Sequence, residues 1–214
     1  RGEIVGLFGP NGAGKTTTFL MMVGLNRPSS GIITLGTKNI TDVPIYRRSA
    51  LGLGYLSQET SIFQSISSLD NVMIALELSH PKKPKATLKK QAEDIIQELQ
   101  LTEVIHTEGR FLSGGQKRRL EIARVMAQKP KLIFLDEPFA GVDPLSIHEM
   151  KSIINMLKHK NIGIMITDHN VRDTLPFCDR AYVMVSGRVI ANGTPNEIIQ
   201  DEQATKAYLG TTFK

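Results

Sequence analysis

The chain of 214 residues contains a single cysteine, Cys178, so it cannot form a disulfide within itself. It also lacks a long apolar run, since no stretch approaches the roughly 20 residues that a helix needs to cross a bilayer. The start, Arg1-Gly2-Glu3, carries no hydrophobic leader. We therefore expect a cytoplasmic chain that neither spans a membrane nor carries a secretion signal.

The sequence does not begin with methionine, and a glycine-rich loop follows after only a few residues. We expect a further segment upstream of Arg1. With 41% hydrophobic residues, the chain is long enough to bury a core without disulfides, and we expect one domain over residues 1–214. Neither an internal repeat nor a low-complexity tract interrupts it.

The charge balance is mildly basic: 26 Lys and Arg against 21 Asp and Glu give a net charge of +5 and a pI near 9.3. Such a balance can indicate nucleic-acid binding. The basic residues, however, are scattered or form short runs such as Lys82-Lys83, with few aromatic residues between them to stack on bases. We expect no nucleic-acid partner, while a mild attraction to an anionic membrane surface fits the same charges.

Strand and helix patterns alternate along the chain, which predicts an α/β fold with a mainly parallel core sheet flanked by helices. Ile4 to Phe8 is a short apolar run, and a glycine-rich turn joins it to a helical pattern over Lys15 to Val23. Further strands are predicted at Leu132 to Leu135 and Ile162 to Thr167. The helix between these two strands should bury one face, formed by Met150, Ile153, Ile154 and Leu157.

Other segments are predicted to extend this core. Short strand candidates at Ile32 to Leu35 and Leu53 to Leu56 suggest a small antiparallel part, and Ser186-Gly187 suggests a hairpin turn. Residues 65–125 are predicted to form a helical lobe, so that 1–64 and 126–214 make up the core. The helical spacing in this lobe is carried by Leu88, Ala92, Ile95, Ile96 and Leu99. A capping box at Thr194 to Glu197 predicts the start of a helical tail.

The glycine-rich turn fits the P-loop pattern of glycine, four residues, glycine, lysine and threonine. Its glycines let backbone N–H groups point at phosphate oxygens, Lys15 can reach the β- and γ-phosphates, and the Thr16 hydroxyl can bind magnesium. A strand before the loop and a helix after it favour this reading over a glycine turn that binds nothing. The predicted ATP-binding residues are Gly9, Pro10, Asn11, Gly12, Ala13, Gly14, Lys15, Thr16 and Thr17.

Two carboxylates, Asp136 and Glu137, follow the predicted strand Leu132 to Leu135. The carboxyl end of a strand in an open parallel sheet is where ligands bind. Asp136 is predicted to hold magnesium and Glu137 to act as the general base toward water. Two acids after a strand are equally typical of a surface turn, and it is the P-loop upstream that favours the site.

The stretch Leu112-Ser113-Gly114-Gly115-Gln116 resembles the signature sequence of ABC transporter ATPases. Alone, it could be an ordinary serine cap at the start of a helix. Further stretches remove that ambiguity: Gln58 matches the glutamine of the family's Q-loop, Ala140 to Asp143 resembles its D-loop, and His169 matches its switch histidine. The resemblance covers the whole chain and implies an ABC-type nucleotide-binding domain of the P-loop NTPase class.

The resemblance also implies how the motifs work together. In this family the P-loop of one subunit faces the signature helix of another across ATP, so we expect a homodimer that binds ATP and Mg²⁺. Glu137, His169 and Gln58 would be catalytic, and Thr16, Gln58 and Asp136 would hold the metal. The residues expected to act on the partner's nucleotide are Ser113, Gly114, Gly115, Gln116 and Asp143. An aromatic residue that stacks on adenine would lie upstream of Arg1.

Three stretches resemble the lipopolysaccharide-export branch of the family: 54–63, 137–144 and 166–172. That branch implies docking under two transmembrane subunits, at the cytoplasmic face of the inner membrane, with Ile62 and Phe63 in the docking region. The same two residues could equally belong to the local core. Alternatives that we keep are a branched-chain amino-acid importer ATPase, a non-transport ABC ATPase acting on DNA or ribosomes, and a nucleotide sensor without turnover, which Glu137 and His169 disfavour.

Overall fold

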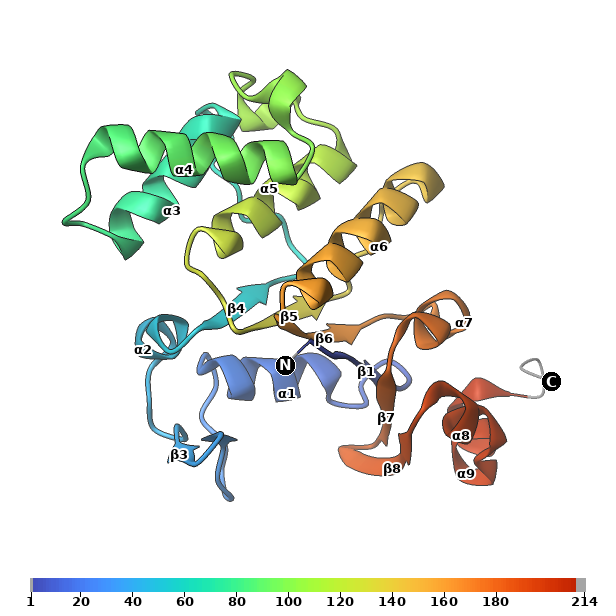
Figure 1. The fold of residues 1–214 in the computed structure, drawn as a ribbon. Coiled ribbons are helices and arrows are strands. Elements are labelled where there is room, and N and C mark those ends of the chain that lie inside the picture. Colours follow the sequence, from blue (N-terminus) through green and yellow to red (C-terminus); the bar gives the residue numbers. More distant parts are fainter. Residues whose placement is uncertain (1, 211–214) are drawn as a thin grey trace.

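The computed structural model describes residues 2–210 and is built on a six-stranded sheet with strand order β4-β5-β6-β1-β7-β8 (Figure 1). The first five strands in this order run parallel, and β8 is antiparallel to β7. The predicted parallel core sheet is confirmed. The strands are β1 (Ile4–Phe8), β4 (Leu53–Leu56), β5 (Leu132–Asp136), β6 (Gly163–Thr167), β7 (Arg180–Val185) and β8 (Arg188–Gly193).

Helices cover both faces of this sheet. Helix α1 (Lys15–Val23) lies along one face and α6 (Pro144–His159) along the other (Figure 1). The four apolar residues predicted to form the inner face of α6 are all buried. A helix with one such stripe is stabilised mainly by packing that stripe on the sheet.

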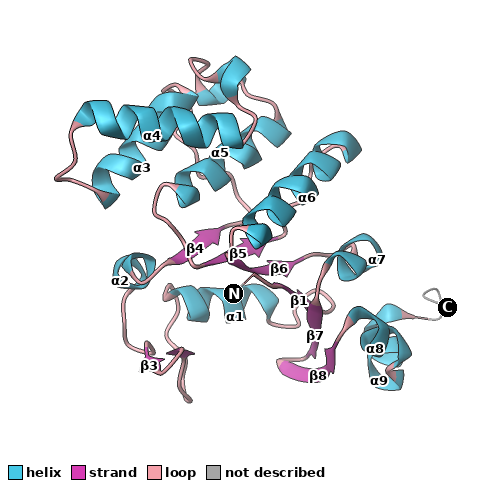
Figure 2. Ribbon diagram, viewed as in Figure 1, coloured by secondary structure: helices cyan, strands magenta, loops and turns pink. Residues whose placement is uncertain are grey.

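A mostly helical segment stands above the β4 and β5 edge of the sheet (Figure 2). It consists of α3 (Ser68–Ser79), α4 (Lys85–Glu98) and α5 (Gly114–Met126), with two short 3-10 turns between α4 and α5. Of the predicted core residues of α4, Leu88, Ala92, Ile96 and Leu99 are buried and Ile95 is half-buried. The tail is formed by α8 (Pro195–Gln200), α9 (Glu202–Ala204) and a π-helical turn (Thr205–Leu209). No helix within residues 2–210 is both long and apolar enough to cross a bilayer.

The prediction that Leu53 to Leu56 belongs to an antiparallel part is wrong. These residues form β4, which pairs in parallel with β5 at the edge of the main sheet. The antiparallel pair is instead β2 (Thr34–Leu35) with β3 (Lys38–Asn39). Helix α5 packs so closely on β4 that a Cβ at Gly54 would lie 2.4 Å from Val125 Cγ1. Burial on both faces is typical of a parallel strand, and four residues of sequence do not reveal it.

Arg48, on α2 (Ile45–Ala50), is 1% exposed and ties α1 to the segment before α2. Its guanidinium donates hydrogen bonds of 2.6–2.8 Å to four backbone carbonyls, those of Met21, Met22, Thr41 and Val43. Two of these carbonyls belong to the last turn of α1, where helix carbonyls lack partners within the helix. Arg48 therefore caps the C-terminal end of the helix that the P-loop opens.

We expect Arg48→Met to lower the free energy of unfolding by about 2–4 kcal/mol, because methionine fills the volume but leaves buried carbonyls without donors. Urea denaturation followed by circular dichroism measures this change. Arg47→Met, which alters an exposed neighbour on the same helix, is the control and should shift stability by less than about 0.5 kcal/mol. Equal effects of the two substitutions would contradict the capping role.

Cys178 is buried, and burial raises the pKa of its thiol to about 12. A thiol with such a pKa is almost fully protonated at neutral pH and is a poor nucleophile. The cysteine is therefore a packing residue.

Candidate active site

The P-loop connects the end of β1 to the start of α1. Gly12 and Gly14 adopt left-handed backbone angles, with φ of 76° and 103°, which glycine tolerates without strain. A Cβ at Gly9 would lie 2.0 Å from the carbonyl oxygen of Met184 on β7, so no side chain fits there. Gly14 caps α1 without a side-chain hydrogen bond. The amides of the first turn of α1 are thus open to an anionic ligand.

Lys15 lies inside the loop and is 6% exposed. Its Nζ donates to the carbonyl oxygens of Gly9 at 2.8 Å and Pro10 at 3.0 Å. Burial lowers the pKa of its ammonium group, and the carboxylates of Glu137 and Asp136 act in the opposite direction. The loop therefore holds a cation at its centre, facing the acidic end of β5.

Asp136 ends β5 and is 2% exposed. Its Oδ1 accepts hydrogen bonds from Thr167 Oγ1 at 2.6 Å and from Thr16 Oγ1 at 3.4 Å. Thr167 is the residue that sheet register places opposite Asp136 on β6. Burial and the neighbouring Asp136 carboxylate, to which it is hydrogen-bonded, raise the pKa of Tyr55 to about 12.

The pairing of Thr16 with Asp136 was predicted, and its oxygens suit a hard cation such as Mg²⁺. Across residues 2–210, no cluster of three or more His, Cys, Asp or Glu side chains could hold a metal by itself. Mg²⁺ is commonly bound through one or two protein oxygens, while phosphate and water complete its octahedron. Gln58, the third predicted ligand, is exposed and borders a cavity of about 140 Å³ together with Glu137.

Glu137 follows β5 in a strained backbone conformation, with φ of 48°. This region costs of order 1–3 kcal/mol for a non-glycine residue and is common at active sites. The amide of Glu137 donates to Thr167, to Oγ1 at 3.0 Å and to the carbonyl oxygen at 3.2 Å, which holds the strained turn. Its carboxylate is 2.5 Å from Nε2 of His169. The structure thus brings the two predicted catalytic residues together.

Hydrogen bonds hold the segment around His169 in place. Asp168 is buried and accepts hydrogen bonds from the Asn170 amide at 3.0 Å and from the Thr174 hydroxyl. Lys151 on α6 donates to the carbonyl oxygen of Asp173 at 2.8 Å. These contacts hold the short helix α7 (Val171–Thr174) against α6 and limit the positions open to His169.

The signature residues and the D-loop lie side by side, and Gly114 and Gly141 border the same small cavity as Gln58 and Glu137. Ser113 caps α5 in a capping box with Gln116, and Asp143 caps α6 by accepting from the Ser146 amide at 3.0 Å. A Cβ at Gly115 would lie 2.5 Å from Ser146 Oγ, so α5 and α6 begin in contact. Within residues 2–210, no hydrogen bond or ion pair joins the signature residues to the P-loop.

Helix α5 carries a buried ion pair that was not predicted from the sequence. Arg118 and Glu121 are 7% and 3% exposed, and their side chains meet at 2.7 Å. Arg118 also donates to the carbonyl oxygens of Ser57 at 2.7 Å and Asp136 at 3.2 Å, while Glu121 accepts from the amide of Ser61 at 2.6 Å. The pair therefore holds both ends of the loop that carries Gln58. Opposite charges three residues apart on a helix more often form an exposed pair. The spacing of Arg118 and Glu121 therefore did not indicate that this pair is buried.

The structure places the two residues predicted for docking differently. Ile62 is 7% exposed and belongs to the hydrophobic core, so its assignment to a docking surface is wrong. Phe63 is 45% exposed, and its ring lies beneath the Arg124 guanidinium, 4.6 Å from centroid to carbon. The loop after Gln58 turns one side chain inward and the next outward, as an extended segment does.

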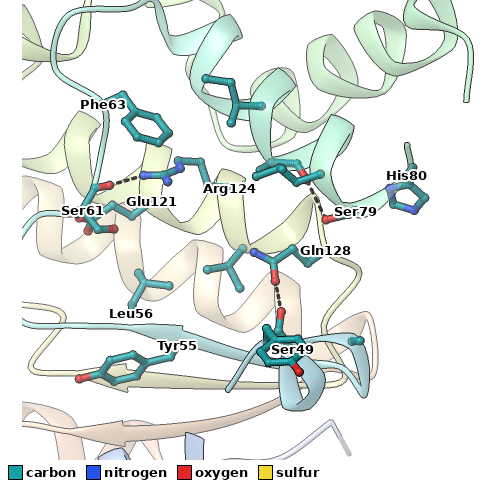
Figure 3. Close-up of a pocket in the computed structure, with 16 residues that line it drawn as sticks. Ser49, Tyr55, Leu56, Ser61, Phe63, Ser79, His80, Glu121, Arg124 and Gln128 are labelled. Carbon is teal, nitrogen blue, oxygen red and sulfur yellow. Dashed lines mark hydrogen bonds between the residues drawn. The ribbon is translucent and has the colours of Figure 1, made fainter. Parts of the chain in front are cut away.

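Phe63 lies at one end of a groove of about 670 Å³ between α2, β4, α3 and α5, here called the Phe63 groove (Figure 3). Figure 3 shows Phe63 and Arg124 together on one wall, with Arg124 hydrogen-bonded to the carbonyl oxygen of Ser61. His80 stands at the other end of the groove. The remaining lining includes Tyr46, Ser49, Leu78, Ser79, Val125 and Gln128.

A P-loop, an acidic strand end paired with a histidine, and a signature helix define an ATP-binding domain of the ABC transporter type. The family model described as ABC transporter matches residues 1–140, and the chain belongs to this family. It is an ATPase coupled to transport.

Among curated relatives, the lipopolysaccharide export system ATP-binding protein LptB of Acidithiobacillus ferridurans is 50% identical, over 100% of this chain and 88% of the relative. The LptB proteins of Haemophilus influenzae and Escherichia coli are 48% and 47% identical, over 99% and 100% of this chain and 88% of each relative. The predicted resemblance to the lipopolysaccharide-export branch is confirmed. A second model, described as branched-chain amino acid ATP-binding cassette transporter, matches residues 188–214.

Solved structures agree with this assignment. MJ1267, an ATP-binding cassette of an ABC transporter, superposes with a TM-score of 0.86 at 27% identity, over 98% of this chain and 89% of that one. The cbiO1 protein of Clostridium perfringens, part of the ABC transporter complex cbiONQ, gives 0.84 at 30% identity, over 96% and 82%. The predicted fold class is confirmed.

Proposed function

We propose that this chain hydrolyses ATP to drive lipopolysaccharide export, working at the cytoplasmic face of the inner membrane through partner subunits. The observation that carries the proposal is its 47–50% identity, over essentially the whole chain, to proteins named lipopolysaccharide export system ATP-binding protein. The paired Glu137 and His169 support turnover rather than nucleotide sensing.

The proposed active site uses the P-loop, from Gly9 to Thr17, to bind the phosphates of ATP. Thr16, Asp136 and Gln58 would hold Mg²⁺, which when bound neutralises phosphate charge. Lys15 would exchange its loop carbonyls for phosphate oxygens. Glu137 would accept the proton of the attacking water as general base, and His169 would orient that carboxylate and then the terminal phosphate.

We propose that the site is completed by a second copy of the chain. The signature residues make no hydrogen bond or ion pair to their own P-loop within residues 2–210, and the sequence holds one of each motif. Ser113, Gly114, Gly115, Gln116 and Asp143 would therefore act on the nucleotide of the partner subunit. The free amides at the start of α5 suit an anion such as the terminal phosphate.

The Phe63 groove is the proposed docking site for transmembrane subunits. It offers an exposed aromatic ring, an arginine above it and walls that mix apolar and polar side chains, which together suit an amphipathic helix. Of the two residues predicted for docking, only Phe63 lines this groove, so the proposal uses Phe63 and not Ile62.

We expect Phe63→Ala to weaken assembly with the membrane subunits at least about tenfold, since exposed aromatic anchors commonly contribute 2 kcal/mol or more. Affinity purification of the assembled complex from membranes measures the loss. Phe111→Ala is a matched control, because Phe111 is 70% exposed beneath Arg110 but lies outside the groove. If Phe63→Ala assembles as well as the control, the groove is not the docking site.

A second candidate function is ATP hydrolysis for a branched-chain amino-acid importer, favoured by the family match at residues 188–214. Purification of the chain from native membranes, followed by mass spectrometry of the bound membrane subunits, separates the two. The export proposal expects subunits that extract lipopolysaccharide, and lipopolysaccharide release from proteoliposomes should require ATP. Recovery of amino-acid permease subunits instead would replace the first proposal with the second.

A further inference from the structure

Five lysines lie within nine residues between the end of α3 and the second turn of α4. Residues 82–90, here called the lysine segment, contain Lys82, Lys83, Lys85, Lys89 and Lys90. All are exposed except Lys83, which is half-buried. Pro81 and Pro84 flank the first two lysines and restrict the backbone of the turn. The segment is therefore a concentrated and well-defined patch of positive charge.

Little of this positive charge is held in ion pairs. Among residues 2–210, one ion pair reaches the segment, between Lys85 Nζ and Glu77 at 3.9 Å, while Glu93 and Asp94 lie one helical turn after Lys89 and Lys90 without an ion pair to them. Lys83 makes a 3.4 Å hydrogen bond to the uncharged Gln91. Most of the charge thus faces solvent and is available to an external anion.

The lysines also stand at the unfavourable end of their helix. Helix N-termini carry partial positive charge and favour acidic residues, yet the first turn of α4 contains none, and Pro84 provides no side-chain cap. Lys85 occupies the first helical position. A segment that violates the local rule for stability in this way is a candidate for a binding role.

The location of the lysine segment indicates the kind of anion. Leu78, Ser79 and His80, which lie just before it in the chain, line the Phe63 groove, and Figure 3 shows Ser79 and His80 at one end of it. Leu78 is 78% exposed, so an apolar side chain stands beside the charges. If transmembrane subunits occupy the groove, the lysine segment lies at the rim of that contact, next to the membrane.

We propose that the lysine segment binds the phosphate head groups of anionic lipids at the membrane surface, beside the docked transmembrane subunits. The proposal rests on the docking role proposed for the Phe63 groove. Clusters of four or more lysines near a membrane are attracted to anionic lipids, each lysine contributing roughly fivefold in affinity. Nucleic acid is the less suitable partner, because no Phe, Tyr or Trp lies between Ser79 and Lys90 to stack on bases.

The test compares vesicle binding by the full-length chain and two variants with equal charge loss. One variant replaces Lys82, Lys83, Lys89 and Lys90 with glutamine. The control variant replaces four exposed lysines elsewhere, namely Lys38, Lys129, Lys131 and Lys206. Binding is measured by co-flotation with vesicles of phosphatidylethanolamine containing 30% phosphatidylglycerol, and with vesicles of phosphatidylcholine alone.

We expect the unaltered chain to bind the anionic vesicles, more weakly as salt rises, and not the zwitterionic ones. The lysine-segment variant should bind at least tenfold more weakly, while the control variant loses less than threefold. The Tm of the lysine-segment variant should be unchanged, because the replaced lysines are exposed or half-buried and form no ion pair within residues 2–210. Equal losses of vesicle affinity in the two variants would overturn the proposal. Tighter binding of the lysine segment to RNA or DNA than to anionic vesicles would also overturn it.

Failure of this inference can be told apart from failure of the docking proposal. Phe63→Ala should bind vesicles like the unaltered chain, while its assembly with membrane subunits is lost. If Phe63→Ala assembles normally and the lysine-segment variant still loses vesicle binding, then the groove assignment is wrong and the lipid contact stands. If vesicle binding does not depend on the lysine segment, the lipid proposal is wrong whatever the assembly result.

Discussion

Glu137→Gln is expected to lower ATP turnover by about 10²- to 10⁴-fold, which is the usual contribution of a general base. Glutamine preserves the shape of the side chain but cannot accept the proton of the attacking water. ATP affinity should stay within a few fold, because the P-loop, Lys15 and Asp136 are unchanged. The variant should therefore accumulate as an ATP-bound dimer, since hydrolysis is the step that would let the two subunits separate.

Phosphate release, nucleotide binding and size-exclusion chromatography with ATP measure the three parts of this expectation. The chain offers a control in Glu93→Gln, which makes the same chemical change on the exposed face of α4. That control should turn over ATP normally and stay monomeric. Near-normal turnover by Glu137→Gln would show that the base has been assigned to the wrong residue.

Local chemistry explains which parts of the site could be predicted from the sequence. The bounds of β1 and α1 were predicted to the residue, because a P-loop demands a strand before its glycines and a helix after its lysine. Asp136 was placed next to Thr16 by the rule that ligands gather at the carboxyl ends of parallel strands. In both cases the function and the fold require the same residues, so a short pattern was informative.

Long-range pairing was the part that the sequence did not reveal. The four residues of β4 look alike whether they pair with β2 or β5, and only packing under α5 decides. Ile62 and Phe63 have similar hydrophobicity, yet one is buried and the other lines a groove. Thr167 and Tyr55, which contact Asp136, are ordinary strand residues until the sheet register is known. Burial and register are properties of the assembled fold.

The buried pair of Arg118 and Glu121 permits a second test with a large effect. We expect Arg118→Met to lower the free energy of unfolding by about 3–5 kcal/mol, because Glu121 would remain buried without its partner. The double substitution Arg118→Met with Glu121→Leu should recover most of this loss, since it removes both charges. The exposed pair of Arg27 with Asp42 supplies the control, and Arg27→Met should cost less than about 1 kcal/mol.

The double variant separates stability from positioning of the loop that carries Gln58. Arg118 holds the carbonyl of Ser57 and Glu121 holds the amide of Ser61, so the variant folds but leaves the loop with one anchor on α5, the hydrogen bond from Arg124 to the Ser61 carbonyl. We expect its turnover to fall about tenfold or more, because misplaced catalytic groups are costly even when the fold is intact. Urea denaturation and steady-state ATPase assays measure the two effects. If the double variant is stable and also fully active, Arg118 and Glu121 serve only in packing. The loop that carries Gln58 would then be positioned on the signature helix by other contacts.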